Sequence, residues 1–294
     1  MGRSNPDIAT FQNVALQNSA LGWYAIADSA QHSSLPGAVV QEGLSVQCLF
    51  GAPQACPLAH HAPHLVELCP PTENWPTWNW ISRHANSKPC VTIIATRMSF
   101  EELFVQLAGC IEVVLPDRFE MFLGFWDPAI LGALMGQGDD RTLHIAGPVL
   151  SSSQKSKLTR GMDSWWYWDR DGAIHSIPIE PLNAASSTAA INLIQAQVDD
   201  LVEACLPDHV LYYVELNQPL LIAEIPVRKR YGVVREALVQ AREVGLLGMK
   251  DLVNFVCVKL IYGERMRTDG EVLGILEKVR EGSLTFPEAL IAFP

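Results

Sequence analysis

The sequence predicts an α+β protein: an N-terminal lobe with a mixed sheet flanked by helices, followed by an all-helical C-terminal lobe. Apolar strand segments alternate with helix signals over residues 1–180, and from about Asn183 onward apolar residues recur at helical spacing. The composition, 49% hydrophobic and 18% charged, is typical of a folded chain. We therefore divide the 294 residues into a mixed α/β lobe, 1–180, and a helical lobe, 181–294.

Apolar strand segments and two hairpin signals account for the sheet of the first lobe. Short runs of apolar and β-branched residues, bounded by Gly and Pro, predict strands at 23–28, 45–50, 64–68 and 90–95. One hairpin is expected over 111–126 and a second over 165–177, with Asp171-Gly172 in its turn. Ser99 with Glu102 has the spacing of a capping box, whereas the polar run 151–161 predicts a loop.

Helix start and stop signals organise the second lobe. Pro207-Asp208 predicts the start of a new helix, and further helices are expected over 231–244 and 249–262. Two capping-box spacings, Thr268 with Glu271 and Thr285 with Glu288, predict the last two helices.

The segment Phe125-Trp126-Asp127-Pro128 predicts a sharp corner between a strand and a helix. An Asp side chain accepts hydrogen bonds from the first free amides of a helix, so Asp127 is a good N-cap. Pro128 fits the first helical position, where no backbone donor is needed. The corner is therefore expected to have a structural role.

Charge and cysteine content exclude several classes of protein. The formal net charge is −11, which argues against a general nucleic-acid binder. Seven cysteines at irregular spacing are typical of reduced thiols. No stretch reaches the roughly 20 apolar residues of a membrane span, and the N-terminus lacks a signal-peptide pattern. We therefore expect a cytoplasmic protein without a membrane span.

Two acidic residues at strand ends are the only candidates for acid/base chemistry. Asp28 and Asp127 each end an apolar strand, so their carboxylates could meet at one edge of a sheet. Short Asp side chains also cap turns and helices routinely, and this interpretation is favoured for both. Because no nucleophile elbow, phosphate loop or zinc-protease motif occurs, we expect no catalytic residue, no cofactor and no enzyme activity.

A histidine-rich segment is one sequence hint of a metal site; the acidic pairs Asp139-Asp140 and Asp169-Arg170-Asp171 lack the ligand pattern of a calcium loop. His60, His61 and His64 lie near Cys56 and Cys69, which are residue types that bind zinc. No Cys-x-x-Cys pair accompanies them, so a polar loop is the better interpretation and no metal is expected.

Two groups of residues are candidates for binding a partner. Trp165, Trp166 and Trp168 could anchor an interface, although a place in the core of the sheet is favoured. The basic run Arg228-Lys229-Arg230 is most simply a solvated patch, with a partner contact as the alternative.

The order of the motifs resembles the adaptor or chaperone family of bacterial type VI secretion, the Tap/TEC proteins. The series runs over about residues 23–150, and each motif alone is weak. Its members are the strand that ends at Asp28, a strand that ends at Phe50, the segment 62–68, the corner Trp126-Asp127-Pro128 and the closing Gly147-Pro148. Where the family often has Arg on either side of the corner, this chain has Gly124 and Ala129.

The resemblance implies a cytoplasmic adaptor that is not an enzyme. Such a protein binds one type VI effector, often at the effector's N-terminal region, and helps load it onto the VgrG spike or its PAAR cap. Two alternatives stay open: an immunity-type protein that binds a toxin, and a hydrolase that uses Asp28 and Asp127.

Overall fold

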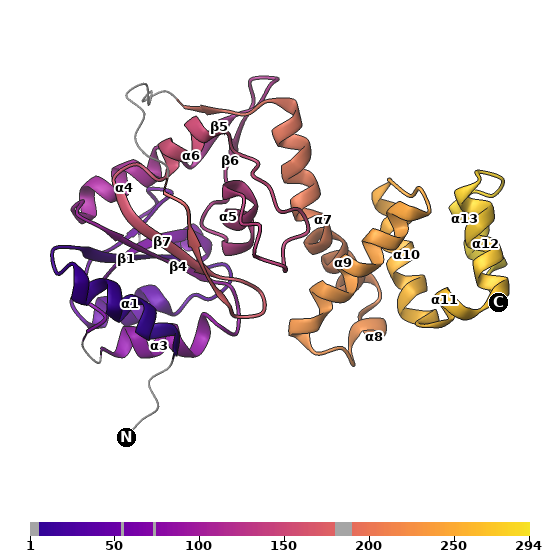
Figure 1. The fold of residues 1–294 in the computed structure, drawn as a ribbon, viewed down its shortest axis with the longest axis horizontal. Helices are drawn as coiled ribbons and strands as arrows, with labels where there is room; N and C mark the ends of the chain where they lie inside the picture. The colour runs from indigo at the N-terminus through magenta and orange to yellow at the C-terminus, as the bar shows by residue number, and fades with distance from the viewer. Residues whose placement is uncertain (1–5, 54–55, 73–74, 180–189) are drawn as a thin grey trace. The chain divides into compact units, whose positions relative to one another are not determined.

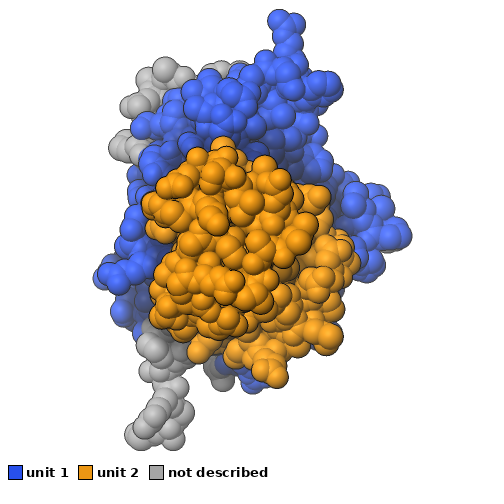
Figure 2. Space-filling view, turned by 90° about the vertical axis from the view of Figure 1, so that its right-hand side faces the viewer, with its two compact units in different colours: residues 1–204 blue, residues 205–294 orange. Residues whose placement is uncertain are grey.

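The computed structural model describes residues 6–53, 56–72, 75–179 and 190–294 and confirms the predicted α+β class. By its contacts the chain forms two compact units, residues 1–204 and 205–294, which are coloured separately in Figure 2. The predicted boundary at 180/181 lies outside the described residues and stays a prediction.

A six-stranded sheet forms the centre of the first unit. Its strand order is β2-β3-β1-β4-β7-β8, and every neighbouring pair is antiparallel. The mixture of parallel and antiparallel pairs that a mixed sheet implies occurs in a separate three-stranded sheet of order β6-β5-β9, where β5 and β9 are parallel. The strands are β1 (Gly22–Asp28), β2 (Val46–Cys48), β3 (Pro63–Leu68), β4 (Val91–Thr96), β5 (Glu112–Val114), β6 (Glu120–Phe122), β7 (Met162–Trp168), β8 (Ile174–Ile177) and β9 (Ile191–Asn192).

Helices cover both faces of the six-stranded sheet (Figure 1). One face packs against α1 (Pro6–Gln17), α2 (Leu35–Gln41) and α3 (Pro76–His84). The other packs against α4 (Phe100–Ala108), α5 (Pro128–Met135), α6 (Ser152–Leu158) and the small sheet. A short 3₁₀ helix, Pro57–His61, precedes β3. Because β1 and β4 are covered on both faces, their sequences are nearly continuously apolar, a pattern more usual in parallel sheets.

Local capping signals explain where several helices begin, and sequence reasoning overlooked one of these signals. The capping boxes Ser99–Glu102 and Thr285–Glu288 are both present, as predicted. The run 151–161, predicted as a loop, instead contains α6, which begins with a capping box of Ser151 and Gln154. The polar sequence hid this helix, which buries Leu158 completely.

The second unit is helical, and its first helix differs from the expectation. The helix α7 (Gln195–Asn217) begins in the first unit and continues through Pro207, where a break was predicted. Proline removes one backbone hydrogen bond, but Leu206 and Val210 on either side are buried, and this packing favours continuation. The helices that follow are α8 (Pro219–Ile222), α9 (Val227–Glu243), α10 (Met249–Tyr262), α11 (Arg265–Thr268), α12 (Gly270–Arg280) and α13 (Phe286–Ala292). Asp269, and not Thr268, caps α12.

None of the helices in the described ranges is both long enough and apolar enough to cross a membrane.

Candidate functional site

The aromatic-Asp-Pro corner has the geometry that its sequence predicts. Asp127 Oδ1 accepts a hydrogen bond of 2.9 Å from the amide of Ala129, and Pro128 is the first residue of α5. Phe125 is fully buried, whereas Trp126 is half-buried and meets the ring of Phe50 edge-on. The corner therefore starts a helix and joins its aromatic side chains to the core.

Gly147-Pro148 lies against the other end of the same helix. The backbone of Gly147 has φ +70°, and a Cβ at this position would collide with the carbonyl oxygen of Ala133 in α5. The amide of Val149 donates to that same carbonyl at 3.1 Å. Only glycine fits this close approach, so the segment has a structural role at the end of α5.

The structure brings Asp28 into the electrostatic range of Asp127, as the paired-carboxylate hypothesis requires. Burial, together with the charge of Asp127, raises the pKa of Asp28 to about 6. Burial also raises the pKa of Asp127, and the charge of Arg170 opposes that rise. Arg170 belongs to the turn between β7 and β8, so it supplies a cation near the corner although Gly124 and Ala129 do not.

Hydrogen bonding favours the capping role for both carboxylates. Asp28 Oδ1 accepts from the amides of Ala30 at 3.0 Å and Gln31 at 3.3 Å, and the residue is only 3% exposed. A substrate could not reach a carboxyl group that is buried and turned toward its own backbone. The geometry therefore supports two caps, while the absence of enzyme activity stays a prediction.

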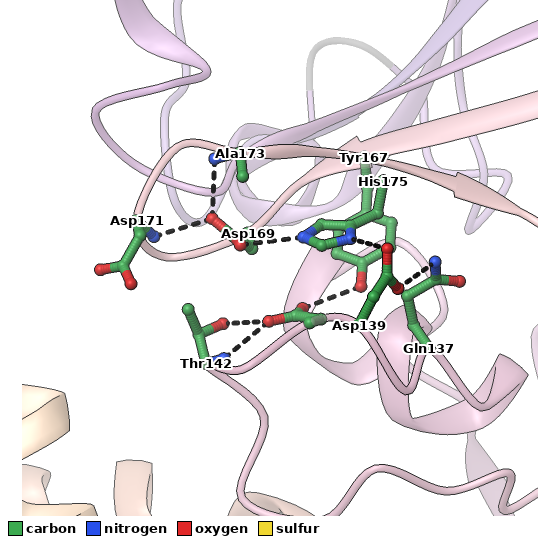
Figure 3. Close-up of polar contacts among 9 residues, drawn as sticks. Gln137, Asp139, Thr142, Tyr167, Asp169, Asp171, Ala173 and His175 are labelled. Atoms are coloured by element: carbon green, nitrogen blue, oxygen red, sulfur yellow. Dashed lines mark hydrogen bonds and ion pairs between the residues drawn. The ribbon is translucent and has the colours of Figure 1, made fainter.

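A cluster of acidic residues around His175, in which Asp140 and Asp169 are buried and Asp139 is exposed, was not anticipated from the sequence (Figure 3). His175 Nε2 lies 2.9 Å from Asp169 Oδ2, and its Nδ1 lies 3.3 Å from Asp139 Oδ2. The second distance allows an ion pair but lacks hydrogen-bond geometry. The ring of His175 stacks on Tyr167, with centroids 5.3 Å apart.

Two elements that are distant in sequence build this cluster. The hairpin of β7 and β8 contributes Tyr167, Asp169 and His175, while the loop after α5 contributes Asp139 and Asp140. In the hairpin turn, Asp169 Oδ1 accepts two backbone amides, those of residues 171 and 173. The Tyr167 hydroxyl donates to Asp140 Oδ2 at 2.8 Å, which joins the hairpin to the loop.

The electrostatics of the cluster favour a protonated histidine. Burial opposes the charge of His175, but the hydrogen bond to Asp169 and the charges of Asp140, Asp169 and Asp139 outweigh it and raise its pKa. Burial and the neighbouring carboxylates also raise the pKa of Tyr167, so its hydroxyl stays a donor. The cluster therefore favours the charged form of His175 more than water does.

The same cluster contains the only group in the described ranges with the spacing of a metal site. One ligand atom each from Asp140, Asp169 and His175 lies within 4.8 Å of the others. These atoms are nevertheless directed at one another, at Tyr167 and at Thr142, so a metal ion would have to replace existing hydrogen bonds. The arrangement fits a structural network better than a coordination sphere.

The histidines considered for zinc do not form a comparable group. His64 Nδ1 lies 3.1 Å from Ser29 Oγ and 3.0 Å from the carbonyl of Ala62, which explains its burial without a metal. All seven cysteines lie in described ranges, and none forms a disulfide.

The three tryptophans proposed as partner anchors lie in the core. Trp165 packs on the face that α4 and α5 cover, and Trp166 and Trp168 pack on the opposite face. Their exposed fractions are 0%, 5% and 1%, so none offers a surface to a partner. The favoured core interpretation is right, and the structure corrects the anchor alternative.

The basic run opens helix α9, and its residues have different environments. Arg230 pairs with Glu215 of α7 at 2.8 Å and also donates to the carbonyl of Ile225. Arg228 and Lys229 are exposed in the first turn of α9, where the helix dipole disfavours positive charge. A partner contact through these two cations stays a prediction.

An apolar groove lies on the surface of the second unit. Its volume is 650 Å³, and it lies between α10 and the segment formed by the end of α7 and α8. Its walls are mostly apolar, with amide side chains and one lysine; they are Tyr213, Asn217, Gln218, Leu221, Met249, Lys250, Val253, Asn254, Cys257 and Ile261.

Exposed apolar side chains accompany this groove. Ile261 is 62% exposed in its wall, and Leu216 and Leu220, at 60% and 88%, come from the same helices, α7 and α8. Sequence reasoning did not predict the groove. The available signal was the presence of apolar residues at helix positions outside the stripe that faces the core.

Comparison with known proteins gives one match. Residues 23–145 match the family model described as a domain of unknown function, DUF4123. No curated protein and no solved structure shows significant similarity to the chain.

Proposed function

We propose that this chain is a cytoplasmic adaptor that binds a type VI secretion effector and helps load it onto the VgrG spike or its PAAR cap. The motif series that resembles the adaptor family runs over about residues 23–150, and the matching domain of unknown function spans 23–145. The motif series and the family match therefore cover nearly the same part of the chain.

The apolar groove of the second unit is the observation that carries a binding function. A groove with apolar walls between helices is the usual receptor for the apolar face of an amphipathic helix. Amides at Asn217, Gln218 and Asn254 provide polar contacts along it, as reversible interfaces require. We therefore assign the groove to an apolar segment of the effector.

Co-expression with the effector encoded nearby tests the proposal. We expect the two proteins to co-purify, and we expect effector secretion to fail in a strain that lacks this chain. Loss of toxicity on co-expression without any effect on export would support the immunity alternative instead. Normal effector stability and secretion in the deletion strain would contradict the proposal.

A matched pair of substitutions tests the assignment to the groove. Ile261→Asp places a charge in the groove wall, whereas Ile291→Asp makes the same change on the exposed surface of α13. We expect Ile261→Asp to weaken effector binding by about 10-fold or more and Ile291→Asp to leave it unchanged, as an interface hot spot requires. Equal binding by the two folded variants would exclude the groove.

A further inference from the structure

Among the described residues, the outer edge of the three-stranded sheet has backbone groups without hydrogen-bond partners. The amide of Leu115 donates to Phe119, and the amide of Leu123 donates to Ile111. Hydrogen-bonded pairs alternate along an antiparallel ladder, so these bonds leave Glu120 and Phe122 in the non-bonded positions. The N–H and C=O groups of both residues therefore point away from β5, toward the open edge.

Neighbouring contacts agree with this orientation. Val114 on β5 occupies the position opposite Glu120, and its carbonyl accepts from Leu193 beside β9, on the far side of β5 from β6. Within the part of the chain that the structure describes, β6 pairs with no strand other than β5, and no turn or loop hydrogen bond reaches the backbone of Glu120 or Phe122. The backbone groups on the outer edge of β6 can therefore form hydrogen bonds with one more strand.

Aromatic side chains lie beside this edge. Phe122 is 52% exposed, and its ring stacks on Phe50 with centroids 4.9 Å apart. Trp126 meets the Phe50 ring edge-on with centroids 5.3 Å apart, and Phe119, which is 71% exposed, precedes the strand. Apolar side chains of an added strand would cover this aromatic surface.

Acidic residues flank the same surface. Glu112 lies directly opposite Phe122, and Glu120 lies two residues before it on the same face. Both carboxylates are exposed, and neither has a cationic partner among the described residues. The first unit carries 10 Lys+Arg against 20 Asp+Glu, so no net positive field offsets them. Complementarity therefore requires lysine or arginine in the added strand.

We propose that the open edge of β6 binds an extended segment of a partner protein by strand addition, and that both basic and apolar side chains of this segment lie on the face that carries Glu112, Glu120 and Phe122. The free backbone groups select an extended segment over a helix, and the two glutamates select a basic one. This interaction goes beyond effector binding in the helical groove, because it uses another surface on the other unit and a different type of contact.

A synthetic peptide provides a defined probe for the full-length protein. We would measure fluorescence anisotropy of a labelled peptide of about eight residues, within the usual length of a strand. Lysine and valine take turns at every second position and threonine fills the positions between them, so that lysine and valine lie on the same face. The controls are the same peptide with glutamate in place of lysine, and a version with N-methylated backbone amides that cannot pair. We expect saturable binding of the first peptide, weakened at least ~10-fold in both controls and reduced by salt.

Substitutions in β6 separate the backbone and charge contributions. Glu120→Pro removes both the carboxylate and the outward backbone N–H. Glu120→Ala removes the same carboxylate but keeps the N–H. Proline is tolerated on the open side of an edge strand. We expect Glu120→Pro to bind the peptide about 10-fold more weakly than Glu120→Ala. The double variant Glu112→Gln/Glu120→Gln should also bind more weakly, whereas Glu101→Gln/Glu281→Gln, with the same charge change elsewhere, should not.

The N-methylated peptide keeps the proposal testable if the proline variant fails to fold. Equal affinity for the N-methylated and unmodified peptides, or no saturable binding of the basic peptide, would overturn strand addition at β6. Equal peptide affinity of Glu120→Pro and Glu120→Ala, when circular dichroism shows that both variants are folded, would also overturn strand addition at β6. None of these measurements uses an effector. Their results therefore test strand addition alone and leave the proposal of effector loading to its own experiment.

Discussion

His175 Nε2 lies 2.9 Å from Asp169 Oδ2 inside the first unit, and this contact joins the two arms of one hairpin around its turn. Both side chains are more than nine-tenths buried. A protonated histidine held by carboxylates should make the stability of this unit depend on pH.

The raised pKa of His175 predicts stability that is lost at high pH. Because the folded-state pKa lies above the unfolded value of about 6.5, the contribution is complete below about pH 6.5 and disappears as the pH rises through the folded value. All eight tryptophans lie between residues 23 and 168, so tryptophan fluorescence during urea unfolding reports on this unit. We expect the free energy of unfolding to fall as the pH rises above about 6.5.

Removing the histidine tests the source of that dependence. His175→Phe keeps an aromatic ring but leaves buried carboxylates without their cation, which we expect to cost about 2–4 kcal/mol near pH 6. The loss of stability above about pH 6.5 should disappear in this variant. An unchanged pH profile would show that another group is responsible.

Asp28→Asn should stabilise the protein at neutral pH. The folded-state pKa of Asp28, about 6, exceeds the unfolded value of about 4, so its ionised form destabilises the fold above pH 6. Asparagine keeps an oxygen for the amides of Ala30 and Gln31 but carries no charge. We expect a gain of roughly 1–3 kcal/mol at pH 7.5 that shrinks as the pH falls through 6 toward 4. Destabilisation at every pH would mean that the charged cap is favourable.

Asp127→Ala should destabilise the corner through loss of its cap. We expect a cost of about 0.5–2 kcal/mol, and Asp127→Asn, which keeps the acceptor, should cost less. Partner binding should fall only as far as folding does. A fully stable Asp127→Ala protein that no longer binds its partner would show that this carboxylate acts directly in binding.

The double substitution Arg228→Gln/Lys229→Gln separates stability from binding on the second unit. Both cations lie at the positive end of α9, so their removal should raise the stability of this unit by about 0.3–1 kcal/mol. Thermal unfolding followed at 222 nm, where the helices dominate, measures the change. If the two residues contact a partner, co-purification should weaken in the stabilised variant; unchanged co-purification would leave them as a solvated patch.

Signals between residues close in sequence were the most reliable predictors. Asp127 caps α5, Ser99 and Thr285 begin their helices, and Asp171-Gly172 forms the hairpin turn, because each depends on bonds within a few residues. The wrong predictions concern segments whose structure depends on contacts with residues far away in the sequence. Tertiary packing preserves α7 through Pro207, and a buried Leu158 supports a helix in a polar run.

The sequence by itself determined the α+β class, the position of the Asp127-Pro128 corner and the helical character of the last hundred or so residues. Only the tertiary structure decided that Asp139 and Asp140 meet His175, that three tryptophans are buried on two faces of one sheet, and that an apolar groove and an open strand edge are exposed. The reason is physical: caps and turns are satisfied by neighbouring amides along the chain, whereas burial and charge pairing depend on segments that only folding brings together.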